Sequence, residues 1–91
     1  MSAMGTGEDR ETRLKRLRMR SMRRGTKEMD ILLMRYSEAR LDALDAAGLD
    51  AYEALLSESD QDLYQWISGQ RTAPQAHAPL VAEIAQVAGR G

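Results

Sequence analysis

The sequence predicts a small all-α protein, a bundle of about five helices. Apolar residues recur at spacings of three and four along most of the chain, and no stretch alternates apolar and polar residues as a strand would. Helix-capping residues stand between the apolar segments. A chain of 91 residues makes one domain, which we place at residues 9–91, after a polar N-terminal segment at residues 1–8 that we expect to be disordered.

The first two predicted helices cover about residues 9–23 and 27–41. The thin apolar stripe of the first consists of Leu14, Leu17 and either Ser21 or Met22. The inner face of the second consists of Met29, Leu32, Leu33 and Tyr36. Between the helices, Gly25 is expected in the left-handed backbone conformation that glycine takes just past a helix end, and Thr26 as the next N-cap.

Three further helices are expected in the second half of the chain. Asp45 caps one over about residues 46–57, and the Ser59-x-x-Asp62 capping box begins another over about residues 60–68, which Gly69 ends. Trp66 should point inward from that helix as a core anchor. After a linker, Pro79 suits the first position of a last helix, whose apolar face is Leu80, Ile84 and Val87.

Charge is distributed unevenly along the sequence. Residues 1–27 hold nine basic and three acidic residues, a net charge of +6, whereas residues 28–91 hold four basic and eleven acidic residues, a net charge of −7. The basic segment could direct the protein to an anionic partner, to nucleic acid or to an acidic membrane face. It could equally fold back on the acidic half of its own chain.

Composition excludes several function classes. Without cysteine there is no thiolate nucleophile and no cysteine-based zinc site, and the lone His77 has no second ligand nearby, so we expect it to be exposed in the linker. The longest apolar run, residues 31–34, is too short to span a membrane, and no signal core follows the N-terminus. We therefore expect no enzyme, no catalytic or metal-binding residues and no stable membrane insertion. The expected location is the bacterial cytoplasm, or the mitochondrial matrix for a processed eukaryotic form.

The junction between the first two helices carries the candidate partner-binding residues Arg23, Arg24, Gly25, Glu28 and Asp30. In one interpretation they form a well-capped helix break with solvated charges that suit the helix dipoles. In the other, Gly25 lets a partner backbone approach, while Arg24 and Glu28 offer a cation and an anion side by side. Spacing alone leaves both open.

Two stretches together resemble a known family. The pattern Arg24-Gly25-x-x-Glu28, preceded by basic residues and followed by residues 29–33, is similar to the signature of the succinate dehydrogenase assembly factors. A second match is Asp60-Gln61-Asp62-Leu63-Tyr64-Gln65-Trp66-Ile67. Together they span about residues 14–67, and the pair is harder to obtain by chance than either motif. Thr26 departs from the family, which often has a larger apolar residue there.

The resemblance implies a non-enzymatic assembly factor with a helical bundle fold. It implies binding to the flavoprotein subunit of succinate dehydrogenase, with fumarate reductase as a further candidate client, and promotion of covalent FAD attachment. The FAD then belongs to the client, and we assign no cofactor to this chain. The alternative is a small nucleic-acid-binding protein that lays its basic first helix along phosphates, and a small acid–base enzyme is a third, weaker class.

Overall fold

A computed structural model describes residues 8–22 and 25–88 of the chain. In this part the regular structure is all helical, which confirms the predicted fold class. Its elements are α1 (Arg10–Met22), α2 (Lys27–Arg40), the short 3₁₀ helix η1 (Leu41–Ala43), α3 (Ala46–Leu56), α4 (Asp60–Ile67) and α5 (Ala78–Ala88). Most of the N-terminal segment for which we expect disorder lies outside the described residues.

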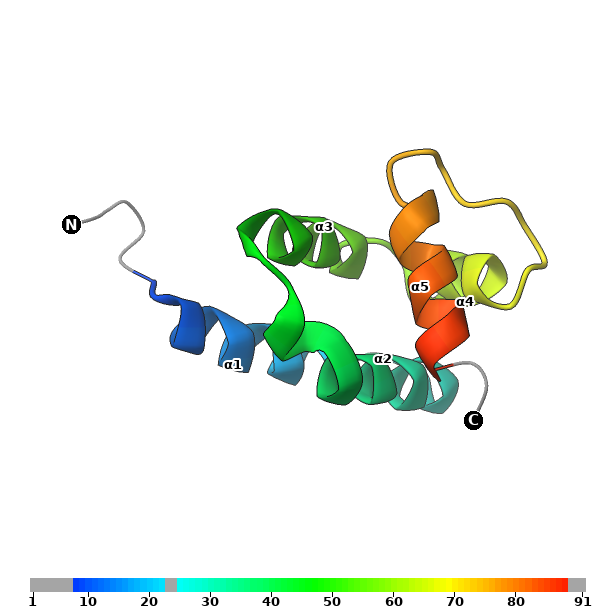
Figure 1. The fold of residues 1–91 in the computed structure, drawn as a ribbon. Coiled ribbons are helices and arrows are strands. Elements are labelled where there is room, and N and C mark those ends of the chain that lie inside the picture. Colours follow the sequence, from blue (N-terminus) through cyan, green and yellow to red (C-terminus); the bar gives the residue numbers. More distant parts are fainter. Residues whose placement is uncertain (1–7, 23–24, 89–91) are drawn as a thin grey trace.

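The helices form a compact bundle in which α1 and α2 run antiparallel (Figure 1). Helix α3 returns along this pair, and α4 and α5 pack against α2 at the other end of the molecule. In the described ranges no helix is both long enough and apolar enough to cross a membrane.

Side-chain caps begin three of the helices, as predicted. The Oγ1 atom of Thr26 accepts a hydrogen bond of 3.3 Å from the Met29 amide at the start of α2. The Asp45 carboxylate caps α3 and the Ser59 hydroxyl caps α4 in the same way. Gly69 has a φ of 85° just after α4, which confirms it as the residue that ends that helix.

The prediction for Gly25 is wrong, because its φ does not lie in the left-handed region. Gly69 is the residue with positive φ in the part of the chain that the structure covers. Gly25 therefore does not end α1 by the usual glycine motif. Its amide is instead bound by a side chain from α4, as described below.

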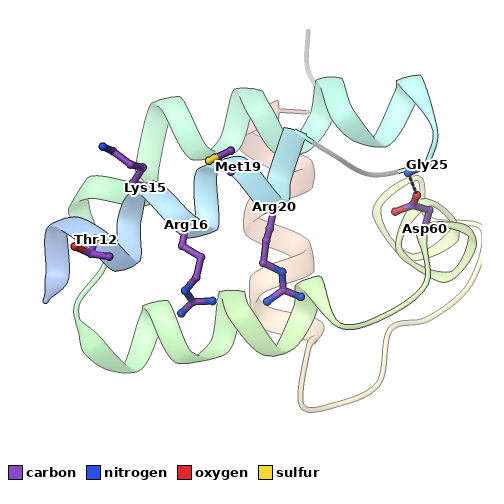
Figure 2. Close-up of a pocket in the computed structure, with 7 residues that line it drawn as sticks. All are labelled: Thr12, Lys15, Arg16, Met19, Arg20, Gly25 and Asp60. Carbon is purple, nitrogen blue, oxygen red and sulfur yellow. Dashed lines mark hydrogen bonds between the residues drawn. The ribbon is translucent and has the colours of Figure 1, made fainter. Parts of the chain in front are cut away.

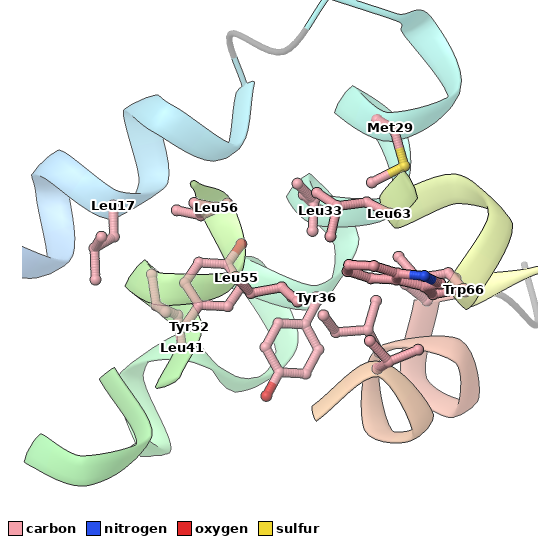
Figure 3. Close-up of a cluster of buried hydrophobic side chains, with 14 of the residues drawn as sticks. Leu17, Met29, Leu33, Tyr36, Leu41, Tyr52, Leu55, Leu56, Leu63 and Trp66 are labelled. Carbon is pink, nitrogen blue, oxygen red and sulfur yellow. The ribbon is translucent and has the colours of Figure 1, made fainter. Parts of the chain in front are cut away.

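One apolar core runs through the bundle (Figure 3). The rings of Tyr36 and Tyr52 stack near its centre with their centroids 5.6 Å apart. Trp66 is 9% exposed, which confirms it as a core residue. The other fully buried apolar side chains include Leu17, Met29, Leu33, Leu41, Leu55, Leu63 and Ile84.

The structure resolves one open choice on α1 in favour of Ser21, which is buried, while Met22 is 52% exposed. The Ser21 hydroxyl donates to the Leu17 carbonyl at 2.8 Å. Since a hydroxyl has one proton, the Tyr52 hydroxyl must be the donor in its 2.5 Å contact with Ser21 Oγ. This polar contact inside the core joins α1 to α3.

The apolar faces of α2 and α5 are shifted from the predicted ones. On α2, Ser37 is buried and Leu32 only partly so. The buried stripe of α5 is Val81, Ile84 and Ala88, with Leu80 and Val87 half-buried at its edges. Helix α5 contacts both α2 and α4, so its most buried line faces the space between them.

The expectation that His77 is exposed is also wrong. Its side chain is 12% exposed, and its Nε2 lies 2.9 Å from Glu58 Oε2. Its ring centroid lies 5.8 Å from that of Trp66. The amides of His77 and Ala78 both donate to the Pro74 carbonyl, which turns the linker back onto the bundle.

Trp66→Ala should lower the free energy of unfolding by about 3–5 kcal/mol, because it removes a large buried ring and leaves a cavity. Urea denaturation followed by circular dichroism measures this loss. Tyr64→Ala, an aromatic deletion at a 40% exposed position of the same helix, is the matched control and should cost less than about 1 kcal/mol. Equal losses in the two variants would contradict the assignment of Trp66 as the core anchor.

Candidate functional site

The junction before α2 is bound to the start of α4. The amide of Gly25 donates a hydrogen bond of 2.6 Å to Oδ2 of Asp60, the first residue of α4 (Figure 2). These residues are 35 positions apart in the sequence and belong to the two separate motif stretches. The hydrogen bond therefore brings both stretches to one place on the surface.

The structure describes three of the five predicted partner-binding residues. Gly25 and Glu28 are exposed, and Asp30 is half-buried in the first turn of α2. Arg23 and Arg24 lie outside the described residues. The described members thus lie together at the start of α2, with Glu28 facing solvent.

An open groove of about 660 Å³ extends from Gly25 and Asp60 along α1. Figure 2 shows the side chains that line it: Thr12, Lys15, Arg16, Met19, Arg20, Gly25 and Asp60. Met19 is 47% exposed, so part of its apolar side chain is available to a partner in this groove. The groove thus combines positive charge with an apolar contact.

A second groove, of about 370 Å³, shares Asp60 with the first. Its lining residues are Thr26, Glu28, Asp60, Gln61, Tyr64, Gln65 and Gln70. Tyr64 is 40% exposed and lines this groove together with Glu28. Asp60 lines both grooves, so the candidate site is a surface that extends from α1 to α4.

Sequence reasoning did not assign Met19, Asp60 or Tyr64 to the site. Asp60 and Tyr64 lie within the second motif stretch, so that stretch contained a usable signal. Met19 falls between the apolar positions of α1, and no sequence pattern marked it as a contact residue.

The basic helix folds back on the acidic half of the chain. Arg13 and Arg16 bind the Glu53 carboxylate on α3, at 3.0 Å and 2.9 Å, and Arg20 lies 3.9 Å from it. Figure 2 shows Arg16 and Arg20 pointing toward α3. The sequence leaves open whether this helix binds an external anionic partner or the acidic half of its own chain. For these arginines the structure favours binding within the chain.

Further pairs complete this arrangement around α1. Arg16 also binds Glu8 at 2.7 Å, Arg18 pairs with Asp42, and Arg10 donates to the carbonyl oxygens of Asp42 and Leu44. Lys15 is exposed and has no ion pair in the described ranges, so it is a positive group of the groove that remains available to a partner.

The guanidinium of Arg16 lowers the pKa of Glu53 below its usual value, and Arg13 adds to this effect against the opposing influence of partial burial. The same Arg16 group lowers the pKa of Glu8. Both carboxylates in turn raise the pKa of Arg16. The cluster is therefore fully charged at neutral pH.

In the described part of the chain, no three histidine or acidic side chains come together as metal ligands. The ring of His77 contacts Glu58 and Trp66, and His77 lines neither groove. What the junction can do chemically is bind: its two grooves offer a carboxylate, an ammonium group, amide side chains and two exposed apolar side chains.

Comparison with known proteins gives the same assignment as the motifs. A family model described as flavinator of succinate dehydrogenase matches residues 15–88. The chain belongs to this family. Its match extends from within α1 to the end of α5 and includes every residue that lines the two grooves except Thr12.

Curated relatives carry matching names. The FAD assembly factor SdhE of Acetobacter pasteurianus is 37% identical over 87 residues, with 93% of this chain and 80% of that protein covered. The mitochondrial succinate dehydrogenase assembly factor 2 of Meyerozyma guilliermondii is 48% identical over 61 residues, which are 67% of this chain and 45% of that protein. The chain thus spans about half the length of that mitochondrial relative.

The lowered pKa of Glu53 predicts how stability depends on pH. The ion pairs of Glu53 contribute fully to stability above pH 4.5, the usual pKa of a glutamate side chain. Their contribution is lost as the pH falls through the lower pKa that Glu53 has in the folded protein. Glu53→Gln should therefore reduce the free energy of unfolding at pH 7 by about 1 kcal/mol and flatten its decline in acid. Thermal denaturation between about pH 3 and pH 7 tests both effects.

Asp50→Asn is the comparison variant, because Asp50 binds Arg13 at the surface with 72% of its side chain exposed. It should change stability by less than about 0.5 kcal/mol at pH 7. If the free energy of unfolding of Glu53→Gln fell in acid as steeply as that of the parent protein, the Glu53 cluster would not anchor α1.

Proposed function

We propose that this protein binds the flavoprotein subunit of succinate dehydrogenase and promotes covalent attachment of its FAD. The related flavoprotein of fumarate reductase is a second candidate client. Family membership supports an assembly role, and the name of the Acetobacter pasteurianus relative supports FAD assembly as its object. The proposed location is the bacterial cytoplasm, or the mitochondrial matrix for a eukaryotic form.

The observation that carries this proposal is the hydrogen bond between Gly25 and Asp60. It joins the Arg24-Gly25-x-x-Glu28 pattern to the second motif stretch, so that residues from both line one surface. In the proposed complex Glu28 makes charge-assisted hydrogen bonds to the client, Tyr64 supplies an apolar contact in the same groove, and Met19 supplies one in the first groove. Arg23, Arg24 and Asp30 are the remaining proposed partner-binding residues.

The proposed mechanism is positioning. The client forms the histidyl–flavin bond with its own residues, and the assembly factor holds the client's capping domain so that flavin and histidine remain in a reactive geometry. Correct placement alone can accelerate a reaction strongly. This chain then needs neither a catalytic residue nor a cofactor of its own.

The nucleic-acid alternative receives less support. It requires the arginines of α1 to contact phosphates, yet Arg13 and Arg16 are bound to Glu53, and Arg18 is paired with Asp42. Phosphate binding would have to break these pairs first. Saturable, sequence-selective binding to duplex DNA or RNA at physiological salt would nevertheless overturn the assembly-factor proposal.

Glu28→Ala should leave the fold intact and weaken binding to the flavoprotein subunit about tenfold, as expected for loss of one hydrogen bond to a charged group. Cells that lack the native protein would be supplied with the variant. Covalent flavin would be read as fluorescence that stays with the flavoprotein subunit through a denaturing gel. We expect the client to remain largely unflavinylated.

Glu38→Ala is the matched control, since Glu38 is an exposed glutamate on the same helix outside both grooves. It should support flavinylation like the parent protein. Equal flavinylation with folded Glu28→Ala and Glu38→Ala proteins would remove Glu28 from the proposed site and return the junction to a merely solvated helix break.

A further inference from the structure

We propose that Asp60 is the positioning residue of this docking surface: its carboxylate fixes the Gly25 backbone and thereby sets how the junction is presented to the client. This inference rests on the proposed function, because it concerns the same surface. In this role Asp60 acts on client binding through Gly25. A residue that merely contacted the client would not need the bond to Gly25.

The geometry at Asp60 is that of a strong tether. An amide that donates to a carboxylate makes a charge-assisted hydrogen bond, and the 2.6 Å distance between Gly25 N and Asp60 Oδ2 is short for this class. The bond connects the segment before α2 with the first residue of α4. It is therefore a long-range constraint on a short helix connection.

The hydrogen bond to Asp60 also gives a reason for a glycine at position 25 that does not involve a left-handed backbone. The φ of Gly25 lies outside the left-handed region, so a positive φ is not the reason for a glycine here. A Cβ atom at this position would lie 3.3 Å from Asp60 Oδ2, which is closer than ordinary van der Waals contact. A side chain at position 25 would thus require the Asp60 carboxylate to move by a few tenths of an ångström, and the hydrogen bond to the residue 25 amide would have to adjust with it.

The rest of the fold does not depend on this bond. Helix α1 is attached through buried Leu17 and through the arginines at Glu53, and α2 through Met29 and Leu33 in the core. Asp60 lines both grooves, so loss of the tether would change their common wall while leaving the bundle folded. The expected defect is in client binding rather than in helix content.

The first test compares three variants for binding to the purified flavoprotein subunit by surface plasmon resonance. Asp60→Ala should weaken binding about tenfold, the scale of one hydrogen bond to a charged group. Asp60→Asn keeps an oxygen that can accept the Gly25 proton and should restore most of the affinity. Asp62→Ala removes a charge from the same helix turn, where Asp62 lies 3.6 Å from Arg71, and should stay within about twofold of the parent protein.

The second test is a double-mutant cycle between positions 25 and 60. If Gly25 is required because of Asp60, Gly25→Ala and Asp60→Ala disturb the same contact, so the double variant should bind about tenfold more weakly than the parent protein, like either single variant. If the two residues contributed independently, their effects would multiply, and the double variant would bind about a hundredfold more weakly than the parent protein. The proposal would be overturned if the losses of affinity multiplied in the double variant. It would also be overturned if Asp60→Asn lost as much affinity as Asp60→Ala.

A third measurement does not involve the client. The ¹H–¹⁵N resonance of Gly25 should lie downfield in the parent protein and in Asp62→Ala, and move upfield in Asp60→Ala. If this shift is absent, the tether does not exist and the inference fails. If the shift is present but the parent protein neither binds nor flavinylates the flavoprotein subunit, the proposed function fails, and with it the docking role of Asp60.

Discussion

The placement of α1 depends on Glu53, the carboxylate of α3 that Arg13 and Arg16 bind and Arg20 approaches. Helix α1 buries only Leu17 and Ser21, which is a small apolar contribution for a helix of 13 residues. Ion pairs at the surface contribute little one at a time, but guanidinium groups that share one carboxylate fix the register of the helix. This attachment places the α1 wall of the first groove, whereas Asp60, which binds the Gly25 amide, lines both grooves.

Local features of the fold could be predicted from the sequence, because capping and helical periodicity are set by neighbouring residues. Thr26, Asp45 and Ser59 cap the helices that they were expected to cap. The faces of α2 and α5 were predicted less well, because which side of a helix is most buried depends on how many neighbours cover it. Helix α5 lies against both α2 and α4, and no spacing rule within α5 contains that information.

Prediction of the candidate site is limited in the same way, because its geometry depends on residues that are distant in the sequence. The motif residues could be found because they resemble a family, but the conformation of Gly25 was mispredicted from the usual role of glycine after a helix. The contact that decides it comes from Asp60, 35 residues away. The burial of His77 has a similar cause, since Glu58 and Trp66 reach it only after the linker has turned back. Long-range polar contacts carry no local sequence pattern.

Under the proposed function, the two grooves are where this small helical chain contacts its client. A domain of this size has too little interior for a deep substrate cavity, so its specific chemistry must lie on its surface. Here that surface has Met19 in one groove and Tyr64 in the other, with Asp60 lining both. Exposed apolar side chains next to fixed charges are suited to binding, because apolar burial supplies affinity while charge complementarity selects the partner. Under the proposed function, the rigidity of the junction matters more than the number of its contacts, because a helper that acts by positioning can hold its client only as accurately as its own surface is held.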